Sequence, residues 1–204
     1  MIQSKASFIL ILSLISCFLL PGLNHAQSQR DKWQQPERIL DSLHIKPGMV
    51  IGEAGAGEGY FTFKLSNRIG PSGKVYANDI DSEKLETLKK HIEHDSITNI
   101  TPLLGKIDDP CFPDSSLDMV IMVYVIHHLK KPIPFFENIK PDLKTGAAVV
   151  IVERDPDKHG GRNGHFLPKE EVQKILIENQ YTIEKIMTFL PRDNIYIAYP
   201  IEKE

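Results

Sequence analysis

A glycine-rich turn between an apolar run and an amphipathic segment constrains this chain more than any other stretch. Residues 49–61 are Met-Val-Ile-Gly-Glu-Ala-Gly-Ala-Gly-Glu-Gly-Tyr-Phe. The apolar start is typical of a buried strand, and residues 60–68 carry apolar side chains at helical spacing. Glycines between a strand and a helix allow a sharp turn and let a ligand approach the main chain. The stretch therefore predicts a ligand-binding turn in an α/β fold.

The spacing of the glycines indicates the kind of ligand. Gly55, Gly57 and Gly59 alternate, whereas the dinucleotide fingerprint is G-x-G-x-x-G. Glu53 precedes them, and its carboxylate would repel a pyrophosphate but suits a ligand with a cationic end. We expect Glu53 and the three glycines to bind such a ligand. The alternative is that they form a structural turn only.

A second strand is expected over residues 74–79. Asp79 ends it, and an acid at this place in a mononucleotide-binding half accepts hydrogen bonds from ribose hydroxyls. Asp81 is the competing acid, but it precedes an amphipathic helix at 83–94 and suits the N-cap of that helix. Asp79 is therefore the predicted ribose ligand.

A nearly continuous apolar run at 117–125 is typical of a central parallel strand, which is buried on both faces. Tyr124, His127 and His128 lie at or just beyond its carboxyl end, the edge where ligands bind in open α/β sheets. A histidine has a pKa near neutrality and suits proton abstraction. We expect His127 or His128 to be catalytic, with Tyr124 orienting it. The alternative is that one histidine packs in the following turn or caps it.

Together these stretches resemble the class I S-adenosyl-L-methionine (SAM)-dependent methyltransferases. Glu-x-Gly-x-Gly-x-Gly at 53–59 resembles their first motif, and Gly-Lys-Val-Tyr-Ala-Asn-Asp-Ile-Asp at 73–81 resembles the segment after it. His-His-Leu-Lys-Lys-Pro at 127–132 is similar to a motif of quinone-type and other small-molecule methyltransferases. The resemblance covers roughly residues 36–200 and implies SAM as the cofactor. It also implies a Rossmann-like α/β fold, with a doubly wound, mainly parallel seven-stranded sheet that ends in an antiparallel hairpin.

The sequence departs from this family at the adenine contact. In many relatives Asp-Ala follows the glycine after the third strand, and that Asp accepts a hydrogen bond from the adenine amino group. Lys106 and Ile107 occupy these places here. A shift of the loop would bring Asp108 or Asp109 to the adenine, and we expect Asp108 to take this role. The alternative role of both acids is to cap the turn before Pro110.

The resemblance implies methyl transfer to a small molecule. With 24 Lys+Arg against 27 Asp+Glu, the chain has a net charge of −3 and no basic patch, so a nucleic-acid partner is not expected. His91 and His94 lack further ligands nearby, so no metal site is predicted. Two alternatives stay open, a catalytically inactive SAM-binding or scaffold domain and an NAD(P)-dependent Rossmann reductase. Glu53 and the glycine spacing argue against the reductase.

The N-terminal segment is expected to be a signal peptide over residues 1–26. Lys5 precedes an apolar run at 8–20, which is shorter than the ~20 residues that span a bilayer. This predicts an exported protein, periplasmic or secreted, without a membrane span after cleavage. The alternatives are an uncut anchor and a lipoprotein modified at Cys17. Polar residues 27–35 are expected to form a linker, and residues 36–204 a single methyltransferase domain.

Overall fold

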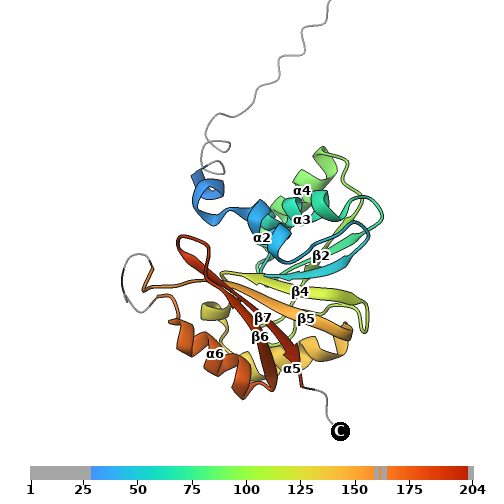
Figure 1. Ribbon diagram of the computed structural model, residues 1–204. Coiled ribbons are helices and arrows are strands. Elements are labelled where there is room, and N and C mark those ends of the chain that lie inside the picture. Colours follow the sequence, from blue (N-terminus) through green and yellow to red (C-terminus); the bar gives the residue numbers. More distant parts are fainter. Residues whose placement is uncertain (1–28, 159–160, 162–164, 202–204) are drawn as a thin grey trace, which may run out of the picture.

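A computed structural model describes residues 29–158, 161 and 165–201 of the chain (Figure 1). The predicted signal peptide and Cys17 lie outside the described residues. In the part of the chain that is described, no helix has the length and apolar character needed to cross a bilayer.

A seven-stranded sheet in the order β3-β2-β1-β4-β5-β7-β6 forms the centre of the molecule. The first five strands pair in parallel, and β7 runs antiparallel to both β5 and β6. This confirms the predicted Rossmann-like sheet with its terminal antiparallel hairpin. The strands are β1 (Val50–Ala54), β2 (Lys74–Asp79), β3 (Ile100–Leu104), β4 (Leu117–Val123), β5 (Leu143–Arg154), β6 (Tyr181–Met187) and β7 (Asp193–Pro200).

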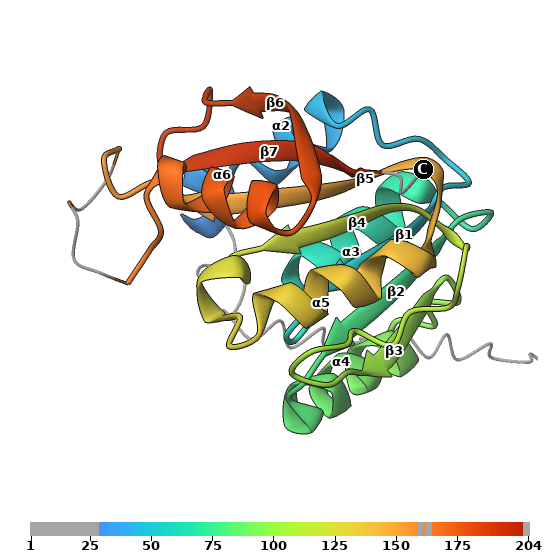
Figure 2. The ribbon, with the colours of Figure 1, turned by 90° about the horizontal axis from the view of Figure 1, so that it is seen from below.

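Helices cover both faces of this sheet (Figure 2). One face carries α2 (Pro36–Ser42), α3 (Tyr60–Ile69) and α4 (Ser82–His94), and the other carries α5 (Pro132–Ile139) and α6 (Lys169–Glu178). Two short 3-10 turns, η1 (Ile126–His128) and η2 (Lys140–Asp142), follow β4 and α5.

The central strand β4 shows why its sequence is almost wholly apolar. Ile121 belongs to the core cluster beneath α2, α3 and α4, and its neighbours Val120 and Met122 belong to the cluster beneath α5 and α6. All three side chains are fully buried. Since successive side chains of a strand point to opposite faces, a strand covered on both sides needs apolar residues at every position.

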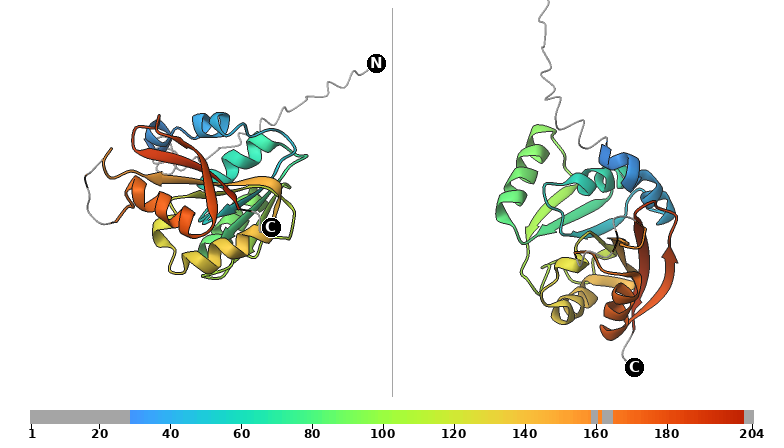
Figure 3. Two further views of the ribbon diagram at one scale, coloured as in Figure 1. Left: turned by 60° about the horizontal axis from the view of Figure 1, so that its bottom comes forward. Right: turned by 90° about the vertical axis from the view of Figure 1, so that its left-hand side faces the viewer.

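The N-terminal segment differs from the linker that its polar composition predicts. Residues 29–34 are helical, and Arg30, Trp33 and Gln34 share the face that contacts the rest of the domain. The Trp33 ring stacks on Tyr124 with 6.2 Å between ring centroids. Arg192, in the turn between β6 and β7, places its guanidinium 4.9 Å from the Trp33 ring centroid. This helix therefore lies beside the end of the β6–β7 hairpin (Figure 3).

Candidate active site

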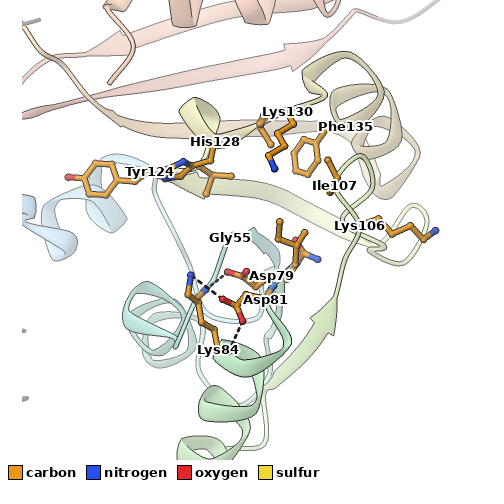
Figure 4. A pocket seen from close by; sticks show the side chains of 15 residues that line it. Gly55, Asp79, Asp81, Lys84, Lys106, Ile107, Tyr124, His128, Lys130 and Phe135 are labelled. Atoms are coloured by element: carbon orange, nitrogen blue, oxygen red, sulfur yellow. Dashed lines mark hydrogen bonds and ion pairs between the residues drawn. The ribbon is translucent and has the colours of Figure 1, made fainter. Parts of the chain in front are cut away.

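A pocket of about 720 Å³ opens at the carboxyl ends of the parallel strands (Figure 4). Asp79, the last residue of β2, and Asp81 face Tyr124 and His128 across this pocket. Parallel strands bring their carboxyl ends to one edge of a sheet, so residues far apart in the sequence meet there. The pocket thus joins the glycine loop, the β2 acids and the histidine pair.

The glycine loop is held to β2 by main-chain hydrogen bonds. The Gly55 and Ala56 amides donate to the Asn78 carbonyl over 2.8 and 2.7 Å. Gly55, Gly57 and Gly59 all have positive φ, the region that favours glycine. Gly59 also precedes α3 as its N-cap.

The glycines differ in what a side chain would meet. A Cβ on Gly55 would lie 2.3 Å from Val125 Cγ2, so close packing requires glycine there. A Cβ on Gly57 would meet nothing within 4 Å, because Gly57 faces the open pocket. The backbone at Gly57 is therefore accessible to a ligand.

Asp79 joins the glycine loop to the next helix. Its carboxylate accepts hydrogen bonds from the Gly57 amide (2.8 Å) and the Asp81 amide (2.9 Å). Asp81 in turn accepts from the Glu83 and Lys84 amides and is the N-cap of α4, as predicted. Both acids line the pocket, and Asp79 is fixed by backbone donors rather than by a cation.

Glu53 lies behind the glycine loop and is buried, and the residues that line the pocket do not include it. It accepts a hydrogen bond of 2.5 Å from Thr62 Oγ1, on α3. Burial raises the pKa of Glu53 to about 8, while the nearby positive charge of Arg30 acts in the opposite direction. The acid is therefore close to the loop and is poorly solvated.

Asp108 is not among the residues that line the pocket. It forms an ion pair of 2.8 Å with Lys131, and this ion pair lowers the pKa of Asp108. Lys106 and Ile107 line the pocket instead, and Ile107 is 46% exposed. Ile80, directly after Asp79, also lines the pocket and is 60% exposed. Two exposed isoleucines at this end provide apolar surface for a flat heterocycle, a feature that the sequence reasoning missed.

The two histidines have different surroundings. His127 is buried, and its Nδ1 lies 2.9 Å from Glu153 Oε2, at the end of β5. His128 lines the pocket, with its ring centroid 3.9 Å from that of His127. Partial burial and the neighbouring His127 and His165 lower the pKa of His128. His128 is thus the histidine of the pair that a substrate can reach, and Glu153 was not predicted.

Tyr124 lines the same side of the pocket as His128, and burial raises its pKa well above the ordinary value. Its hydroxyl is buried near Asp193, whose own pKa burial raises to about 6. Tyr124 is therefore a neutral hydrogen-bonding group at neutral pH. Within residues 29–158 and 165–201, no group of three or more His, Cys, Asp or Glu is arranged to hold a metal ion.

Comparison with protein families matches residues 51–146 to a model described as a methyltransferase domain. A demethylmenaquinone methyltransferase of Lactococcus lactis is 30% identical over 125 residues, which are 61% of this chain and 49% of that protein. The catalytic subunit of a tRNA (adenine(58)-N(1))-methyltransferase of Yarrowia lipolytica is 31% identical over 81 residues, 40% of this chain and 21% of that protein. The chain spans half or less of the length of these two relatives.

Solved structures share the fold. A SAM-dependent methyltransferase from Aquifex aeolicus has a TM-score of 0.78 at 23% identity, covering 89% of this chain and 98% of that one. The geranyl diphosphate C-methyltransferase of Streptomyces coelicolor has a TM-score of 0.66 at 13% identity, covering 85% and 82%. The matched domain and these neighbours support SAM as the cofactor. The pocket has parts that suit it, with an open glycine loop, a fixed carboxylate at the predicted ribose position and an apolar end.

Proposed function

We propose that this chain is a SAM-dependent methyltransferase that acts on a small molecule. The observation that carries the proposal is the Asp79 carboxylate, which is bonded to the amide of Gly57 and faces the open pocket. One carboxylate thus organises the loop and presents its remaining lone pairs to a ligand. The match of residues 51–146 to a methyltransferase domain supports this interpretation.

The pocket residues have distinct roles in binding the cofactor. Asp79 accepts hydrogen bonds from the ribose hydroxyls, and Ile80 and Ile107 flank the adenine. Gly57 allows the ligand close to the backbone, and Glu53 lies buried behind the loop. When bound, SAM supplies an electrophilic methyl group on a sulfonium, so the protein mainly has to align the acceptor with it.

His128 is the proposed base for an acceptor that must lose a proton. Because its surroundings lower the pKa of His128, the imidazole is neutral near pH 7 and able to accept a proton. His127 is held beneath it by Glu153 and is a positioning residue. Tyr124 contributes its ring to the same side of the pocket, while its neutral hydroxyl stays buried near Asp193.

The acceptor is a small molecule in this proposal because the demethylmenaquinone relatives recur among the matches and the net charge is −3. A nucleic-acid substrate is disfavoured by the charge balance, although one relative acts on tRNA. The inactive scaffold and the NAD(P)-dependent reductase are the competing functions.

Calorimetric titration of the protein with SAM, and separately with NADH, tests the cofactor. We expect micromolar SAM binding and weaker binding of NADH. Asp79→Asn should weaken SAM by ~1.5–3 kcal/mol, the range for a hydrogen bond to a charged group. Asp95→Asn, at the exposed end of α4, is the matched control and should bind normally. Preferential binding of NADH would overturn the proposal.

Turnover separates an enzyme from an inactive binder. The protein is incubated with SAM and a panel of phenols and quinols, and S-adenosylhomocysteine is measured. Product that depends on the acceptor is expected. Tight SAM binding without product for any acceptor would favour the scaffold function.

We also propose that residues 1–26 direct export and are removed before Gln27, as the apolar run and its length suggest. Intact-mass analysis of the protein from the periplasm or medium of a bacterial host tests this. A mass that begins at Gln27 is expected. A lipidated Cys17, or an uncut chain in the membrane fraction, would replace this proposal with one of its alternatives.

A further inference from the structure

A continuous strip of rings and guanidinium groups leads away from the pocket at His128. The ring centroids of His128 and His165 are 5.9 Å apart, and those of His165 and Phe166 are 4.5 Å apart. Arg154 Cζ lies 4.6 Å from the Phe166 ring centroid and 5.2 Å from that of Trp33. This aromatic–arginine strip comprises His128, His165, Phe166, Arg154, Trp33 and Arg192.

The strip begins on the side of the pocket that the adenosine part of the cofactor leaves open. His128 lines the pocket beside Tyr124, on whose ring Trp33 stacks, and Ile107 lies at the opposite end (Figure 4). All six strip residues are exposed or half-buried. An acceptor that approaches His128 without crossing the cofactor beside Asp79 therefore lies along the strip.

Two arginines of the strip lie against one indole ring. Arg192 Cζ is 4.9 Å from the Trp33 ring centroid, at nearly the same distance as Arg154 Cζ. Neither guanidinium forms an ion pair with a described residue, and Arg154 Nε has no hydrogen-bond partner among them. Asp193 attracts Arg154 but is 0% exposed, so it does not cover the outer side of the guanidinium. Because guanidinium groups pack flat on rings and bind carboxylates with two hydrogen bonds, the strip suits a planar anion.

We propose that the strip binds the methyl acceptor and that this acceptor is an aromatic carboxylate with a free hydroxyl group. Its ring packs against Trp33 and Phe166. Its carboxylate pairs with Arg154 and Arg192, and its hydroxyl reaches His128. This inference rests on the proposed function, because it takes methyl transfer from SAM as the reaction, and it narrows the class of acceptor.

Methyl transfer to such an acceptor balances with His128 as the base. The hydroxyl proton passes to His128, and an oxygen lone pair forms the bond to the methyl carbon. The electrons of the broken carbon–sulfur bond remain on sulfur, so the products are a methyl ether and S-adenosylhomocysteine. The acceptor carboxylate is unchanged and holds the ring with its hydroxyl towards His128.

Pairs of acids and amides isolate the negative charge, because a carboxamide has nearly the shape of a carboxylate without its charge. The full-length chain is given SAM with hydroxybenzoates, dihydroxybenzoates and hydroxycinnamates, each beside its amide, and S-adenosylhomocysteine is measured. We expect kcat/KM to be ~10–100-fold higher for at least one acid than for its amide, mainly through a lower KM, as for a charged hydrogen-bonded contact.

Arginine variants test which groups carry this preference. Arg154→Met should reduce it to within about threefold, and Arg154→Lys, which retains the charge, should keep part of it. Arg192→Met, in the turn between β6 and β7, should also lower it. Arg38→Met is the matched control, because Arg38 covers the ring of Phe189 outside the strip, and it should keep the full preference. Calorimetry should show unchanged SAM binding in all four variants.

The outcomes separate this inference from the proposed function. If every acid reacts no better than its amide, or if only uncharged acceptors react, the carboxylate site is refuted while methyl transfer stands. If Arg154→Met and Arg192→Met slow acids and amides by the same factor, the arginines only support Trp33 and the inference is wrong. If SAM does not bind the wild type, or no acceptor of any charge is methylated, the proposed function fails and this inference fails with it.

Discussion

At the scale of single residues, the proposed role of a base depends on which of two adjacent histidines a substrate can reach. His127 is committed to Glu153, and His128 faces the pocket. The two rings are close enough for a charge on one to disfavour a charge on the other. The difference between the buried His127 side chain and the accessible His128 side chain follows from the 3-10 turn, which directs neighbouring side chains to different places.

The ring of His128 should titrate below the ordinary histidine pKa. Burial contributes most to the lowered pKa of His128, and the neighbouring His127 contributes next. Removing His127 takes away one positive neighbour, so His127→Asn should raise the pKa of His128 towards 6.5. An NMR titration of the histidine ring protons between pH 5 and 8 measures it.

The wild-type protein, measured under the same conditions, is the reference for this comparison. A pKa of His128 that falls in this variant would contradict the assignment of the two rings. If an acceptor is found, His128→Asn should reduce its turnover by about 10²–10⁴-fold, the usual contribution of a general base.

The positions of some site residues could be predicted from the sequence, and those of others could not. Asp79 is placed by the strand before it, and the main chain of a neighbouring loop fixes its carboxylate. Asp108 could not be placed in the same way, because its direction is set by Lys131 on a distant segment. Glu153 ends a predictable strand, but its contact with His127 depends on the pairing of β4 with β5.

At the scale of elements, the glycine loop needs glycine at two positions for different reasons. Gly55 has φ 77° and a neighbour in the way of any side chain, whereas Gly57 has φ 58° and open space. Glycine at position 55 allows the loop after β1 to pack against Val125, which follows β4. Glycine at position 57 allows a ligand to approach the backbone.

Alanine at the two positions should therefore have different effects. Gly55→Ala combines a positive φ with a clash against Val125, so we expect a loss of about 2–4 kcal/mol in the free energy of unfolding. Gly57→Ala should cost about 1–2 kcal/mol, the backbone term alone, yet should weaken SAM at least tenfold because the methyl group stands in the pocket. Urea unfolding and SAM titration measure the two quantities.

The double variant Gly55→Ala with Val125→Ala tests the reason for the first effect. Removing the valine methyls relieves the contact, so part of the lost stability should return relative to Gly55→Ala. The assignment is wrong if Gly57→Ala binds SAM normally or if the double variant is less stable than Gly55→Ala alone.

Elements with strong periodicity were predictable, and one without it was not. The order of strands and helices, and the terminal hairpin, follow from apolar runs and turn residues. The helix at 29–34 has Trp33 as its only large apolar residue, so its sequence resembles a polar linker. It is ordered by contacts with Tyr60, Tyr124 and Arg192, which a local pattern does not reveal.

At the scale of the whole molecule, buried acids give the fold a preferred pH range. Burial raises the pKa of Glu53 to about 8, of Asp142 to about 7 and of Asp193 to about 6. A carboxyl whose pKa is higher in the folded chain than in the unfolded chain favours folding at low pH, and this advantage is lost as pH rises to the folded value. The contribution of these three acids to stability should therefore decline from about pH 4 to about pH 8.

Asp142 offers the clearest test, because it lies in η2 and outside the pocket. Its side chain is buried, its Oδ2 has no hydrogen-bond partner among the described residues, and Asp114 and Asp109 add repulsion. Above pH 7 the folded state must hold an ionised carboxylate there. Below the ordinary pKa of 3.8, both folded and unfolded chains carry the neutral acid.

Asp142→Asn removes the charge and nearly preserves the shape, so its effect should depend on pH. At pH 8 we expect the variant to be more stable by about 1–2 kcal/mol, or roughly 2–8 °C in melting temperature. At pH 4 the difference should vanish, because the wild-type side chain is then largely protonated. Glu178→Gln, exposed at the end of α6, should shift the melting temperature little at either pH. Equal stabilisation by Asp142→Asn at both values would mean that the amide gains new hydrogen bonds, and the charge argument would fail.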